Sequence, residues 1–213
     1  MAPMGGLWGE GIQYSIPPSS VSRQEVKMVS IPSLWLPIVL SSILVFFASF
    51  VIHMLLPYHH SDYGKVPSED QVQDALRKFN IPPGDYMIPC GGGPEAMKNP
   101  EFKERFAKGP VLMMTIFKPA GMGMGKNLAQ WFVYLLVVGV LAAYVTGRAL
   151  PIGSPYLEVF RFAGCTAFIA YSMALWQNSI WYKQQWSTTI KNTFDGLVYG
   201  LLTAGVFGWL WPK

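Results

Sequence analysis

Charged residues are scarce in this chain. Asp, Glu, Lys and Arg together make up 13% of its 213 residues, about half the share of a typical soluble domain. The formal net charge is only +4 and no basic stripe runs along the sequence, so nucleic-acid binding has no support. The two cysteines, Cys90 and Cys165, lie far apart and do not form a disulfide framework. These shortages argue against a nucleic-acid-binding protein and against a disulfide-rich scaffold.

Patterns typical of common catalytic and cofactor sites are missing as well. No CxxC or HxxxH spacing supplies a set of metal ligands, and no GK[ST] follows the glycines at 91–93 to form a phosphate loop. Cys90 precedes those glycines, but no histidine is placed by sequence to activate it as a nucleophile. An enzyme acting on a lipid-phase substrate would have to use Asp62, Asp85 and His60 as its acid and base groups. We therefore predict that the protein is not an enzyme, and the sequence implies no particular cofactor.

The chain does contain long apolar blocks, each near the roughly 20 residues that a helix needs to cross a bilayer. The blocks predict four transmembrane helices, at residues 34–56, 128–145, 160–182 and 196–211. The expected fold class is an all-α membrane protein with a small α/β extramembrane cap between helices 1 and 2. Its expected parts are a tail at 1–33, helix 1 at 34–56, the cap at 57–126 and helices 2–4 within 127–213.

Four crossings place both termini on one side of the membrane. Lys and Arg residues near the helix ends are slightly more frequent on the side of the cap. Because such residues favour the cytoplasmic side, we expect a cytoplasmic cap and termini on the opposite side.

Small residues recur at every fourth position in the three later helices. Such stripes let helix backbones approach closely, and close packing drives helix association in lipid. We expect these three helices to form a tight core, with the Phe-rich first helix outside it or facing a partner. The predicted packing positions are Gly139, Ala143, Gly147, Ala163, Ala167, Ala170, Ala174, Gly196, Gly200, Ala204 and Gly208.

Within the cap, the pattern predicts two short helices and an extended run. Residues 68–71 read as a capping box, and apolar residues follow at helical spacing to about Phe79. A second helix is expected to begin at Asn99, with Pro100 in its first turn, and to end at Gly109. Residues 111–117 favour a strand. A cap of this size holds little core, so we expect it to lean on the membrane or on a partner.

All three histidines lie near the end of the first helix. His59, His60 and Asp62 are candidate metal ligands, although neighbouring histidines on a helix point about 100° apart. His53 is a candidate ligand for a pigment or another cofactor, because ionisable groups inside a membrane are functional candidates by default. One hypothesis is therefore a small metal-handling, ion-handling or transport protein that uses these three histidines and Cys90.

Two sequence runs carry a resemblance: PYHHSDYGKVPSEDQVQDALRKFNIPPGDYMIPC at 57–90 and WQNSIWYKQQWSTTIKNTFDG at 176–196. Through them the chain resembles a family of uncharacterised bacterial four-helix integral membrane proteins, over most of residues 34–212. The resemblance implies a multi-pass protein of the bacterial inner membrane, and it transfers no catalytic assignment. In that membrane the Lys and Arg distribution places the termini in the periplasm. Residues 1–33 look like an addition to that pattern.

The leading hypothesis is a non-catalytic integral membrane subunit that stabilises a larger bacterial complex for photosynthetic or respiratory electron transfer. It rests on the missing catalytic patterns, the aromatic content of 15%, the Phe-rich first helix and a tail without a core of its own. The expected partners are the lipid bilayer and other membrane subunits, which would bind through the tail, helix 1 and the cap at 57–126.

Overall fold

The structure is a computed structural model that describes residues 28–119 and 123–213, so most of the predicted tail lies outside the described residues. Helices make up most of the described chain. Within the described residues, three runs of helix are long and apolar enough to cross a membrane: Ile31–Leu55, Gly125–Ala149 and Tyr156–Trp181. The prediction of a mostly helical fold is confirmed, and the three apolar helices are consistent with a membrane protein.

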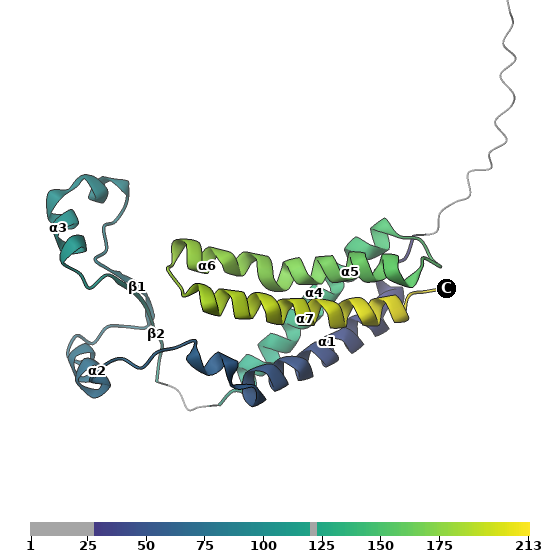
Figure 1. Ribbon diagram of the computed structural model, residues 1–213, viewed down its shortest axis with the longest axis horizontal. Coiled ribbons are helices and arrows are strands. Elements are labelled where there is room, and N and C mark those ends of the chain that lie inside the picture. The colour runs from purple at the N-terminus through teal and green to yellow at the C-terminus, as the bar shows by residue number, and fades with distance from the viewer. Residues whose placement is uncertain (1–27, 120–122) are drawn as a thin grey trace, which may run out of the picture.

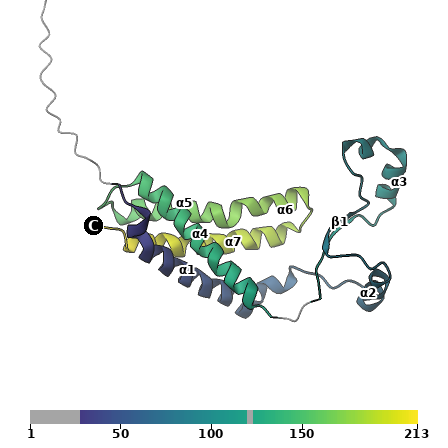
Figure 2. The ribbon, with the colours of Figure 1, turned by 180° about the vertical axis from the view of Figure 1, so that it is seen from behind.

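In the part of the chain that the structure describes, four long helices lie side by side and form a bundle (Figure 1). They are α1 (Trp35–Phe50), α4 (Gly125–Ala149), α5 (Tyr156–Ser172) and α7 (Trp186–Trp209), with the short α6 (Trp176–Trp181) continuing the direction of α5. Both ends of the described chain meet at one end of this bundle. Met28 pairs with Pro151 there, and the Trp211 indole donates a hydrogen bond to the Pro151 carbonyl at 3.0 Å. The cap lies at the opposite end (Figure 2).

The fourth predicted crossing is not confirmed. Helix α7 has 24 residues and packs along α5 and against α1. Its N-terminal half, however, carries Lys191 and Asp195 together with threonines, which make it less apolar than the three candidate spans. Four transmembrane helices therefore stay a prediction.

The small residues of α7 allow its close contact with α5. A Cβ added at Gly200 would lie 3.1 Å from Cβ of Phe168 and 3.3 Å from the carbonyl oxygen of Gly164. A Cβ added at Gly164 would in turn lie 2.8 Å from Cβ of Ala204. Ala163 and Ala167 of the predicted stripe are fully buried, whereas Ala174 is exposed. The two backbones thus approach each other at Gly164 of α5, which is not among the predicted packing positions, and at Gly200 and Ala204 of α7, which are.

The expectation that the first helix lies outside the core is wrong. Helix α1 packs against both α4 and α7, and it buries Ser41, Ser42 and Val45. Gly139 of α4 also faces this helix, since a Cβ added there would lie 3.1 Å from a methyl carbon of Ile38. Serines are small, and the Ser42 hydroxyl donates to the Ile38 carbonyl of its own helix at 2.8 Å, so it can be buried without an unpaired polar group.

The cap contains α2 (Glu69–Arg77), β1 (Gly84–Ile88), α3 (Pro100–Lys108) and β2 (Leu112–Ile116), and the two strands pair antiparallel. Helix α3 begins as predicted, because the Asn99 side chain accepts a hydrogen bond from the Glu101 amide at 2.8 Å. The predicted capping box is wrong: Ser68 has φ 51°, and its side chain makes no capping hydrogen bond. This left-handed backbone turns the hydroxyl away from the first amides of α2.

Candidate functional site

The end of α1 brings two histidines together. After Phe50 the helix widens into a π-helical turn, Val51–Leu55, which carries His53. Pro57 then begins a 3-10 turn, Pro57–Ser61, since a proline without an N–H cannot extend the helix. The chain folds back so that the rings of His53 and His59 lie with their centroids 4.5 Å apart.

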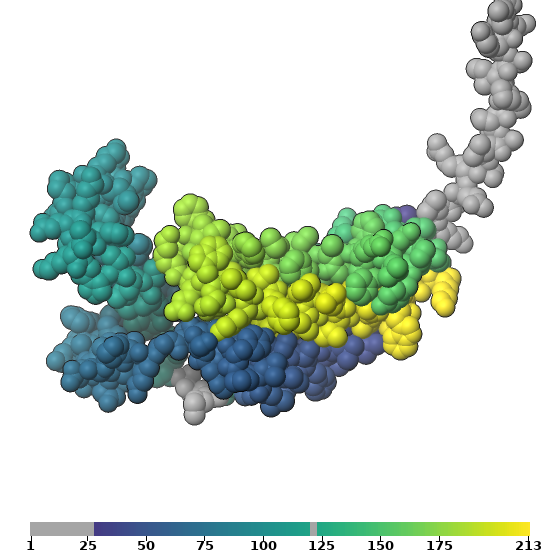
Figure 3. All heavy atoms as spheres, in the orientation of Figure 1, coloured from purple at the N-terminus to yellow at the C-terminus, as the bar shows by residue number. Residues whose placement is uncertain are grey.

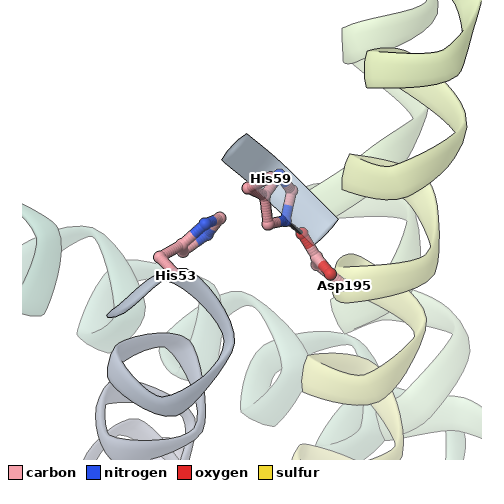
Figure 4. A group of neighbouring side chains, drawn as sticks. All are labelled: His53, His59 and Asp195. Atoms are coloured by element: carbon pink, nitrogen blue, oxygen red, sulfur yellow. Dashed lines mark hydrogen bonds and ion pairs between the residues drawn. The ribbon is translucent and has the colours of Figure 1, made fainter. Parts of the chain in front are cut away.

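Asp195 of α7 meets this turn from the other side. Asp195 is only 2% exposed. The Tyr58 hydroxyl donates a hydrogen bond to one carboxylate oxygen, and Nε2 of His59 lies 2.9 Å from the other. Figure 4 shows His53, His59 and Asp195 converging from three separate segments of the chain.

Asp62 and Lys191 complete the network. Nδ1 of His59 lies 2.6 Å from Oδ2 of Asp62. The Lys191 ammonium donates to Oδ1 of Asp62 at 2.7 Å, to the Tyr58 carbonyl at 2.6 Å and to the Ser61 hydroxyl at 2.8 Å. Lys191 and Asp195 lie one helical turn apart on α7, so together they hold residues 57–62, the docked segment, on that helix.

The network shifts the acidity of two groups in the docked segment. Burial raises the pKa of the Tyr58 hydroxyl, and its hydrogen bond to the Asp195 carboxylate raises that pKa further. Burial alone would also raise the pKa of the Asp62 carboxyl. Hydrogen bonds from Lys191 and His59 outweigh burial and hold the pKa of Asp62 below its ordinary value.

These directions predict a pH window for docking in protein without a bound ion. A lowered Asp62 pKa stabilises docking above the ordinary value of 3.8, and this contribution is lost as the pH falls through the lowered pKa. A raised Tyr58 pKa stabilises docking below the ordinary value of 10.0, and this contribution is lost as the pH rises above it. A spin label on Tyr63→Cys, in a chain with Cys90 and Cys165 replaced by Ser, should therefore become mobile at both extremes of pH.

Asp62→Asn is the control for the acid limit, since it should already be mobile at neutral pH and should lack the acid transition. An acid transition in Asp62→Asn that matches the one in the parent chain would contradict the assignment.

An apolar cavity of about 340 Å³ lies beside His53, between α1 and the start of α4. Its lining is Phe46, Ser49, Phe50, His53, Met54, Met124, Leu128 and Trp131. The Ser49 hydroxyl accepts a hydrogen bond from the Trp131 indole at 2.9 Å, so these two polar groups satisfy each other. The volume is in the range of small-molecule sites. The cavity gives room for a ligand at His53, and pigment or cofactor binding stays a prediction.

The structure separates the candidates that the sequence grouped together. In the described chain, one group of three potential metal ligands has all its ligand atoms within 4.8 Å of one another: His53, His59 and Asp195. His60 is exposed and outside this group, and Cys90 is an exposed free cysteine of the cap. Asp62 contacts His59 but is not itself in the group.

Asp195 was missed by sequence reasoning, because it lies 136 residues beyond His59. The available signal was a carboxylate directly before the apolar run at 196–211, where a charge close to lipid is costly unless it has a partner or a function. Asp85, a candidate acid, instead accepts a hydrogen bond from Thr115 of the neighbouring strand at 2.7 Å.

The chain matches no protein-family model, no curated protein and no solved structure. The chemistry of the site is therefore argued from its geometry, and the resemblance to bacterial membrane proteins stays a prediction.

Proposed function

We propose that this protein is an integral membrane subunit of a larger assembly, in which the cap binds another subunit. The observation that carries this proposal is that the cap has almost no buried residues. Across residues 63–119 only Pro89 and Phe102 are buried. A two-stranded sheet and two short helices with so little burial are marginally stable on their own. A partner surface would supply the missing burial.

Exposed apolar side chains of the cap support the same proposal. Phe117 is 80% exposed, Phe79 73% and Met97 64%, and the cap projects beyond the end of the bundle (Figure 3). A groove of about 630 Å³ runs between α2 and β2, with Leu76, Ile116 and Phe117 among its lining residues. Exposed apolar residues around a groove are typical of protein–protein contact surfaces.

The proposed membrane arrangement has four crossings, with α7 as the fourth. Both ends of the described chain lie at one end of the bundle and the cap at the other, which supports an even number of crossings. The proposed location is the bacterial inner membrane, with the cap in the cytoplasm. The assembly would be a photosynthetic or respiratory complex, in which this chain stabilises neighbouring subunits and performs no catalysis.

The groove predicts a difference between two matched substitutions. Phe117→Asp should lower the affinity of the cap for its partner by about tenfold or more, because a charge would replace an apolar contact at the centre of the interface. Tyr63→Asp changes an aromatic residue that is 90% exposed and does not line the groove, so it should have a much smaller effect. Membranes solubilised in mild detergent and separated by size give the measurement. A wild-type chain that elutes as a lone monomer would overturn the proposal.

One observation favours the rival function, a small metal-handling or ion-handling protein: His53 and His59 lie together beside Asp195. Uptake of metal ions into sealed vesicles containing the purified chain would support this rival. A bound structural ion without uptake would be compatible with the proposed subunit.

A further inference from the structure

We propose that His53, His59 and Asp195 bind one divalent transition-metal ion, with Zn²⁺ as the reference ion, where α1 ends beside α7. This site is independent of the assembly proposed above, since it lies where α1 ends beside α7 and not in residues 63–119, the part of the cap proposed to bind another subunit.

The ligand set suits such an ion. Two imidazoles and one carboxylate are a common protein contribution to a four-coordinate zinc site, with a water as the remaining ligand. Their ligand atoms already lie within 4.8 Å of one another. Bonds of about 2 Å in a tetrahedral site separate ligand atoms by roughly 3.3 Å. The 2.9 Å between Nε2 of His59 and Oδ2 of Asp195 therefore needs only a small opening to admit an ion.

Surrounding hydrogen bonds orient two of the three ligands. Asp62 accepts at Nδ1 of His59, which directs Nε2 toward Asp195. The Tyr58 hydroxyl holds the other oxygen of Asp195. A carboxylate behind a histidine ligand is the usual second layer of a metal site, where it fixes the ring and makes the nitrogen a better ligand.

The charges around the site also favour a cation. Lys191 pairs with Asp62, which balances that carboxylate. Within the described residues, the basic group at ion-pair distance from Asp195 is His59. Because carboxylate oxygens only accept hydrogen bonds, His59 can bond both carboxylates only when both of its nitrogens carry protons. The alternatives for the buried Asp195 are thus a protonated His59 or an ion that replaces the proton on Nε2.

His53 distinguishes these alternatives. In the described chain its ring makes no hydrogen bond, although it lies 4.5 Å from the ring of His59. A protonated His59 would leave His53 without a role, because the charged ring of His59 would repel a positive charge on His53. A metal ion uses His53 as its third protein ligand, and the π-helical turn that carries it is a feature often found at functional sites.

The test uses the full chain in detergent, purified with a tag that contains no histidine, stripped with a chelator and titrated with Zn²⁺. We expect a single Zn²⁺ per chain by elemental analysis after gel filtration. Replacing Zn²⁺ with Co²⁺ should give the intense visible absorption of a four-coordinate site. Absence of stoichiometric binding would overturn the proposal and favour a protonated His59.

Two matched substitutions separate ligands from neighbours. His53→Ala should lose most of the Zn²⁺ affinity and the Co²⁺ spectrum. His60→Ala changes a histidine that lies outside the site and should keep both. Asp62→Asn should weaken Zn²⁺ binding by about 10- to 100-fold while keeping the Co²⁺ spectrum. His53 makes no hydrogen bond in the described chain, so its loss should leave the elution volume unchanged. Wild-type affinity in His53→Ala, or equal losses in His53→Ala and His60→Ala, would refute the assignment.

Discussion

Asp195→Ala is expected to release the docked segment from α7 and to lower the free energy of unfolding by about 3 kcal/mol or more, measured in metal-free protein. Asp195 is buried and accepts from Tyr58 and His59, so its removal leaves a partly buried hydroxyl and a partly buried imidazole without their partner. Titration with SDS from mild detergent, followed by tryptophan fluorescence, measures the loss.

Two further variants show which property of Asp195 matters. Asp195→Asn keeps a hydrogen-bond acceptor for Tyr58 and should lose less than the Ala variant. Asp85→Ala removes an exposed carboxylate of the cap and should change the free energy of unfolding by no more than about 0.5 kcal/mol. Equal losses in Asp195→Ala and Asp85→Ala would show that Asp195 does not hold the docked segment.

Gly200→Leu should separate α5 from α7. The added Cβ would lie 3.2 Å from the backbone nitrogen of Phe168 and 3.3 Å from the carbonyl oxygen of Gly164, and backbone atoms cannot move aside as a side chain can. Overpacking of this kind costs about 1–3 kcal/mol, and here we expect the upper end of that range. The same SDS titration measures the change.

Gly205→Leu is the matched control, on the same helix and with the same added volume. A Cβ at Gly205 would meet only the Tyr156 hydroxyl, at 3.8 Å, so the cost should be much smaller. If both variants lose the same stability, the effect comes from leucine in the helix and not from the contact with α5.

Elements that depend on residues close together in the sequence could be predicted from it. The second and third candidate spans follow from apolar runs, and α3 begins at Asn99 because an asparagine before a proline is a strong helix start. The prediction of a capping box at Ser68 was wrong although its residue types fit. The backbone enters α2 through a left-handed residue, which sequence alone does not reveal.

Long-range placement could not be predicted in the same way. Helix α1 carries serines where the other helices carry glycine and alanine, so the Gly and Ala stripes alone wrongly predict that it lies outside the core. For the candidate site, the sequence identified His53, His59 and Asp62, but it grouped His59 with the adjacent, exposed His60. Asp195 joins His59 only through the packing of α7 on α1, which no local pattern encodes.

The pairing of Tyr58 with Asp195 spans 137 residues of sequence, and Lys191 reaches the same turn from the same helix. During translation the end of α1 therefore emerges long before its partners on α7. Until α7 has left the ribosome and packed beside α1, Tyr58, His59 and Asp62 have to be satisfied by water or lipid headgroups. Docking of residues 57–62 on α7 is consequently a late step in folding. A nascent chain arrested before Lys191 should expose these residues to added protease.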